Sequence, residues 1–106
     1  MTTFDDRERK FENKHAHDQE VAFKTHTRRN KLLGLWAAEL LGLTGKEAEN
    51  YARDVAVADF EKHGDEHVVR KVLNDFTRAG IDKTAETIHA KMAALYPIAK
   101  TQIEKE

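Results

Sequence analysis

The sequence predicts an all-α fold, a small antiparallel four-helix bundle preceded by a flexible N-terminal arm over residues 1–20. No window of four to eight residues alternates apolar and polar side chains strongly enough to indicate a strand. Apolar residues recur instead at steps of three and four along most of the chain, as they do on the buried face of a helix. Glycines separate these segments, and the short loops that result favour antiparallel neighbours.

The first helix of the body is expected over residues 21–41, because Gly42 provides a C-terminal stop. Its sequence at 28–39 is RRNKLLGLWAAE, in which a basic stretch passes directly into the most apolar part of the chain. Such a helix must bury its leucines and the only tryptophan in a core. We expect three basic side chains to stay in water: Arg28, Arg29 and Lys31. They are the candidates for a secondary contact with a partner, although a solvated helix face is the more usual outcome for such residues.

The second helix is expected over residues 45–62, because Thr44 and Glu47 have the spacing of a capping box. The sequence GLTGKE at 42–47 resembles a phosphate-binding loop, but two residues separate its glycines where four are needed. The first turn of a helix still offers free amides to an anion. The candidate residues for weak contact with ADP or ATP are Thr44, Lys46 and Tyr51.

The third and fourth helices are expected over residues 65–79 and 82–104. Asp65 and Asp82 stand where a side chain can cap the first free amides of each helix. Pro97 lies inside the fourth helix and removes one of its backbone hydrogen bonds. We therefore expect a kink or a frayed end at Pro97.

The N-terminal arm, residues 1–20, carries little apolar surface besides Phe4 and Phe11. These two residues are seven apart, so a helix places them on one side. A stripe this thin cannot be buried alone, and such a segment frays in isolation and orders against a partner that supplies apolar surface. A solvated tail without a role is the alternative that the pattern leaves open.

Composition excludes several classes of protein. The formal net charge of the 106 residues is −1, which gives no overall attraction to nucleic acid. The absence of cysteine excludes disulfides, thiolate zinc sites and thiol nucleophiles. No segment approaches the roughly 18 apolar residues of a membrane span, and the N-terminus is too charged for a signal peptide. We expect a cytoplasmic protein that neither inserts into a membrane nor binds nucleic acid.

Catalytic and metal-binding motifs are also missing from the sequence. It contains no serine-nucleophile elbow, no zinc-protease motif and no acidic calcium loop. Among the histidines, His15 and His17 are two apart and so face different sides of a helix, while His63 and His67 lie on either side of Gly64. Surface histidines are the simplest interpretation. We expect no metal, no cofactor and no enzymatic activity.

Six stretches of the sequence carry a family resemblance. They are FDDRE at 4–8, FENK at 11–14, AHD at 16–18, RRNKLLGLWAAE at 28–39, ADFE at 58–61 and GDE at 64–66. Together they resemble the ζ subunit of alphaproteobacterial F1Fo-ATP synthase, an ATPase inhibitor family. The resemblance thins after Gly80, and Pro97 departs from the family's pattern.

This resemblance implies that residues 1–20 are an inhibitory element, poorly ordered in the free protein and helical when inserted at a catalytic α/β interface of F1, near γ. It implies that the α, β and γ subunits are the partners, that hydrolysis is blocked while synthesis is largely spared, and that the protein reaches the inner membrane through F1. The residues that would make the inhibitory contact are Phe4, Asp5, Arg7, Glu8, Phe11, Glu12 and Lys14.

Two other function classes remain open on the residues alone. One is a regulatory helical protein that binds a nucleotide or another small ligand at its polar loops and helix ends. The other is a helical adaptor unrelated to ATP synthase, since a tail that orders against a partner fits both.

Overall fold

The computed structural model describes the backbone of residues 3–61 and 64–106, and the side chains of residues 17–58 and 64–106. These residues form four helices and no strand, which confirms the predicted all-α, four-helix class. The helices are α1 (Thr3–Leu40), α2 (Gly45–Glu61), α3 (Asp65–Arg78) and α4 (Ala85–Lys105). None of the helices in this part of the chain is long and apolar enough to cross a membrane.

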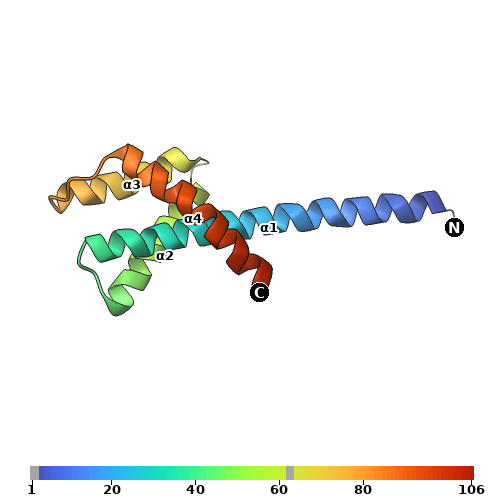
Figure 1. Ribbon diagram of the computed structural model, residues 1–106, viewed down its shortest axis with the longest axis horizontal. Coiled ribbons are helices and arrows are strands. Elements are labelled where there is room, and N and C mark those ends of the chain that lie inside the picture. Colours follow the sequence, from blue (N-terminus) through green and yellow to red (C-terminus); the bar gives the residue numbers. More distant parts are fainter. Residues whose placement is uncertain (1–2, 62–63) are drawn as a thin grey trace.

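The longest element is α1, whose 38 residues correspond to about 57 Å of helix. Its N-terminal half extends well beyond the other three helices, and the molecule measures 65 × 25 × 23 Å (Figure 1). We expected a first helix from residue 21, but α1 begins at Thr3 and continues through that position. The sequence explains this continuity, because residues 1–33 contain neither glycine nor proline. The division into arm and body stays a prediction about function.

The core lies where α1 meets the other three helices. α1 makes its most extensive contacts with α2 and α4, and α3 packs against α2 and α4. The Trp36 ring meets the fully buried Phe76 ring edge-on, with centroids 5.7 Å apart. The buried cluster comprises Leu33, Ala37, Val55, Val68, Val69, Val72, Phe76, Ile88, Met92 and Leu95.

A glycine allows α1 and α2 to approach closely. A Cβ atom added to Gly34 would lie 2.6 Å from the Cα atom of Ala52, well inside van der Waals contact. Ala52 is itself fully buried. The only glycine within the apolar run of α1 is therefore a packing residue, placed where the two helix backbones meet.

The ends of α1 and α3 follow the expected glycine signals. Gly42 and Gly80 adopt φ values of 79° and 73°, in the left-handed region. The amide of Leu43 donates to the carbonyl of Ala38 at 2.9 Å, and that of Ile81 donates to Phe76 at 2.8 Å. These bonds satisfy carbonyls that the helix ends would otherwise leave unpaired.

The starts of the helices differ from what we expected. Asp82 does not cap α4, because the helix begins two residues later, where the Thr84 hydroxyl accepts from the Thr87 amide at 3.2 Å. Asp65 does not cap α3 either, since the N-cap residue is Gly64, and Asp65 makes a tertiary contact instead. Before α4, Asp82 and Thr84 are both residue types that cap helices, and propensity alone does not choose between them.

The expected cap of α2 and the expected frayed end at Pro97 are not found. No side-chain capping bond joins Thr44 to α2 within the described chain, where the Thr44 carbonyl accepts from the Ala48 amide at 3.4 Å. α4 continues past Pro97 to Lys105, so the end of the helix does not fray there, whereas the kink that we gave as the alternative stays a prediction. Buried residues on both sides of the proline, Leu95 and Ala99, hold the helix against the core.

Candidate functional site

The predicted inhibitory residues occupy the projecting part of α1. Their backbone lies within the helix that extends away from the body (Figure 1). The side chains of Phe4, Asp5, Arg7, Glu8, Phe11, Glu12 and Lys14 lie outside the described residues. The roles expected of these side chains therefore stay predictions.

The base of this projection is held by the last turns of α4. Arg28 donates from Nη1 to Gln102 Oε1 at 2.9 Å and forms an ion pair with Glu106. The His26 ring meets the Tyr96 ring edge-on at 5.4 Å. These contacts join residues about 70 to 80 positions apart in sequence, and they fix where α1 leaves the body.

A basic groove of about 770 Å³ lies between α1 and α2, and we call it the α1–α2 groove. α1 contributes Arg28 and Lys31 to its lining, and α2 contributes Lys46 and Arg53. Among the described residues, Glu49 is the only acidic one that lines it. Arg28 and Lys31, predicted as a partner contact, thus share one groove with Lys46, predicted as a nucleotide contact.

Arg29 does not belong to this surface. We expected it to stay in water, but it is only 5% exposed. Its Nη2 atom lies 2.7 Å from Asp65 Oδ1 at the start of α3, and its Nε atom donates to the Asn30 Oδ1 atom at 3.2 Å. The ion pair with a carboxylate from α3 offsets the cost of removing the guanidinium from water. The role of Arg29 in the described structure is to join α1 to α3.

Asn30 is a polar core residue that sequence reasoning missed. Its side chain is fully buried and accepts from Arg29, while its Nδ2 atom has no partner among the described atoms. The sequence signal that would have found it is its place in the helical repeat. Asn30 lies three residues before Leu33 and seven before Ala37, both of which are fully buried.

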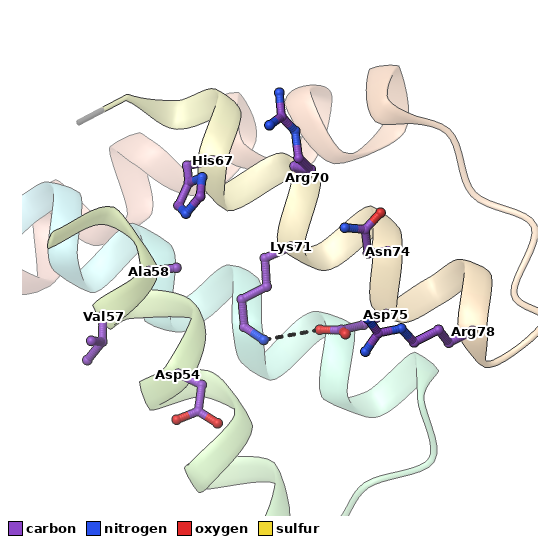
Figure 2. A pocket seen from close by; sticks show the side chains of 9 residues that line it. All are labelled: Asp54, Val57, Ala58, His67, Arg70, Lys71, Asn74, Asp75 and Arg78. Carbon is purple, nitrogen blue, oxygen red and sulfur yellow. Dashed lines mark hydrogen bonds and ion pairs between the residues drawn. The ribbon is translucent and has the colours of Figure 1, made fainter. Parts of the chain in front are cut away.

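A second groove, of about 490 Å³, lies between α2 and α3 (Figure 2). At its side, the Tyr51 hydroxyl donates to Asp75 Oδ2 at 2.8 Å. Lys71 reaches the same carboxylate at 3.3 Å, as Figure 2 shows, and its Nζ atom lies 5.2 Å from the Tyr51 ring centroid. Burial and the bond to Asp75 raise the pKa of the Tyr51 hydroxyl well above its ordinary value.

These positions separate the three candidate nucleotide contacts. Lys46 lines the α1–α2 groove, whereas Tyr51 is engaged with α3, and Thr44 lines neither groove. The residues were grouped because they are close in sequence, but α2 directs Lys46 and Tyr51 to different neighbours. Across the described residues, no cluster of three histidine, aspartate or glutamate side chains is arranged to hold a metal ion.

Comparison with known proteins identifies the family. A family model described as ATPase inhibitor subunit zeta matches residues 1–102. One solved structure, determined by solution NMR, is 46% identical to this chain, with a TM-score of 0.69. The match covers 78% of this chain and 94% of that one. No curated protein matches the chain.

Proposed function

Because this chain belongs to the ATPase inhibitor subunit zeta family, we propose that it blocks ATP hydrolysis by inserting the start of α1 into a catalytic α/β interface of F1, near γ. The family itself is one of inhibitors, which makes the chain a regulatory protein and not an enzyme, and implies that it binds the F1 part of ATP synthase. In this proposal the protein is cytoplasmic and reaches the inner membrane only through F1.

The observation that carries the proposal is the projection of α1 (Figure 1). A helix that extends beyond its own domain has a surface available for a partner. The family match begins at residue 1 and so includes this segment. Among the described side chains, which begin at residue 17, the first buried residue is Thr25 and the core cluster begins at Leu33.

The physical mechanism is a wedge. Hydrolytic turnover requires a catalytic interface to open and close as γ rotates, and a helix lodged there stabilises one closed state. Phe4 and Phe11 are the apolar anchors, and each contributes on the order of 2 kcal/mol when fully buried. Ordering the segment on binding consumes part of that gain. The charged residues expected to fix its register are Asp5, Arg7, Glu8, Glu12 and Lys14.

The test is an ATP hydrolysis assay on F1 with the full chain and two variants. Deletion of residues 1–18 should abolish inhibition, and Phe4→Ala with Phe11→Ala should weaken it at least about tenfold, because tenfold requires only about 1.4 kcal/mol. Circular dichroism should show that both variants keep a cooperative melt, because the described core lies elsewhere.

A matched control replaces two exposed apolar residues of the body, Leu40→Ala with Ile98→Ala, and should leave inhibition unchanged. If the deletion variant inhibits as well as the full chain, the wedge is refuted. Unchanged inhibition by the phenylalanine variant would move the main contact to the surface of Arg28 and Lys31.

A further inference from the structure

The α1–α2 groove carries positive charge that the described acidic side chains neutralise only in part. Within the described part of the chain, Lys31, Lys46 and Arg53 form no ion pair with any acidic side chain, although Glu49 also lines the groove. Arg53 donates only to the neutral Asn50, at 2.6 Å. Arg28 is the exception, because Glu106 already pairs with it. Three cations are therefore available to a partner.

The arrangement of these cations fits an extended partner better than a small anion. Lys46 and Arg53 are seven residues apart on α2, which places them about 10 Å apart along the helix axis. Lys31, Lys46 and Arg53 are all exposed, and Ala56 is the only buried residue among the described residues of the lining. A single phosphate needs donors that converge on one point, whereas a row of carboxylates matches charges distributed along a groove.

The groove also offers apolar surface to a polypeptide. Leu35 and Ala56 line it, and Val57 is 43% exposed at its edge. Protein interfaces commonly combine such an apolar centre with a charged rim, and the rim sets the association rate and its salt dependence. A chain carrying carboxylates and a few apolar side chains would complement both features.

α1 also determines how far this groove lies from the arm. Arg28 is 17 residues beyond Phe11 in the same uninterrupted helix, a separation of about 25 Å. A helix inserted by its first turns thus holds the groove well outside the site of insertion. Once the arm is bound, the body is tethered to F1, so the groove meets a second contact on F1 at a raised effective concentration.

We propose that the α1–α2 groove is a second docking surface, which binds an acidic polypeptide segment on the outside of F1 while the arm occupies the catalytic interface. This inference rests on the proposed function and adds a partner chemistry to it. The groove increases affinity through charge and apolar contact, and the arm supplies the block. Lys46 and Arg53 are its defining residues, because they belong to α2 and have no part in the arm.

The experiment compares two charge-reversal variants of the full chain. Lys46→Glu with Arg53→Glu alters the groove, and Arg70→Glu with Lys83→Glu makes the same change of net charge at exposed positions outside the groove (Arg70 is labelled in Figure 2). Both pairs should leave the melting temperature nearly unchanged. A glutamate at position 46 is favourable in the first turn of α2, and Arg53 has only an exposed neutral partner.

Inhibition of F1 and direct binding to F1 are measured for each variant at low and at high salt. The groove variant should require at least about ten times more protein for half-inhibition at low salt, and the difference should shrink at about 1 M salt, where screening reaches about 3 Å. The control variant should differ from the wild type by less than about twofold. Equal inhibition by the two variants overturns the docking surface while leaving the proposed function intact.

Other outcomes separate the two proposals from each other. A wild-type chain that binds F1 without inhibiting refutes the wedge, and loss of that binding in the groove variant still supports the docking surface. No binding by the wild type refutes both. If the wild type binds anionic vesicles and the groove variant does not, the groove is assigned to a lipid and the proposal is overturned. If an ADP titration shifts the amide signals of Lys46 and Arg53 while the groove variant inhibits normally, the groove is assigned to a small anion, which also overturns the proposal.

Discussion

Replacing Gly34 with alanine should force α1 and α2 apart. The added Cβ atom would lie 2.6 Å from Ala52 Cα and 3.2 Å from both the Ala52 Cβ and carbonyl oxygen atoms. The nearest obstacle is backbone, so no side chain can rotate to relieve the contact. Restoring an ordinary carbon–carbon distance requires a local separation of about 1 Å, which forfeits a quarter to a half of the dispersion energy across that part of the interface.

The magnitude follows from two opposing effects. Overpacking a close helix contact costs about 1–3 kcal/mol, and a contact with backbone belongs at the upper end of that range. Alanine favours the helix over glycine by about 1 kcal/mol, which offsets part of this cost. We expect Gly34→Ala to lower the free energy of unfolding by about 1–2 kcal/mol, and the melting temperature by about 5–10 °C for a chain of this size.

Thermal and urea unfolding followed by circular dichroism measure this change. Ala94→Gly, at an exposed position of α4, reports the helix-propensity effect without a packing contact. Ala52→Gly should not rescue Gly34→Ala, because the 2.6 Å contact is to the Cα atom that glycine retains. A Gly34→Ala variant as stable as the wild type would refute the close approach of α1 and α2.

Two further predictions concern buried polar contacts. Asp65→Asn should lower the free energy of unfolding by about 1–2 kcal/mol in urea titration, because it removes the charge that pairs with the buried Arg29; the half-exposed position of Asp65 limits the effect. The control is Glu66→Gln, which should cost less because its partner His89 is exposed. Equal costs for the two variants would contradict this account. Burial and Asp75 raise the pKa of Tyr51 above its ordinary value of 10.0, so the stabilisation from its protonated hydroxyl is complete below pH 10 and declines as the pH rises further. Above pH 10 the wild type should therefore lose stability more steeply than Tyr51→Phe in parallel urea titrations, and parallel curves would show that the hydroxyl is not held in its protonated form.

The sequence was sufficient for the ends of α1 and α3 and for the buried face of α3, where the deciding pattern is local. Gly42 and Gly80 end their helices as predicted, because each left-handed residue is stabilised by bonds to the turn just before it. The sequence also indicates the buried face of α3, since Val68, Val72 and Phe76 recur at helical spacing and all three are fully buried.

Local signals gave the wrong N-cap residue for α3 and α4, where more than one start of the helix was compatible with the sequence. Asp65 had the right residue type for an N-cap, yet its carboxylate meets Arg29, 36 positions earlier, at 2.7 Å. Asp82 was the predicted cap of α4, but the helix starts from Thr84, which is also a residue type that caps helices. A short-range rule identifies the candidates, but the packing of the whole helix selects among them.

The candidate surfaces were predicted in part. Arg28, Lys31 and Lys46 were each selected from the sequence, but their meeting in one groove requires α2 to lie along α1. Arg53 was missed, because a lone arginine on a charged helix face carries no signal of its own. Arg29 could not be assigned correctly, because its burial depends on where α3 begins.

By itself the sequence determined the all-helical class, the glycines that end α1 and α3, and the family. The first two depend on residues that are near one another in the chain, and the family depends on motifs that can be recognised without the fold. Only the tertiary structure decided that Arg29 is buried, that Gly34 meets Ala52, and that cations from two helices share one groove. The physical reason is the range of the interaction. A backbone turn is closed by neighbours in the chain, whereas an ion pair or a helix contact depends on a partner that only the folded chain brings within reach.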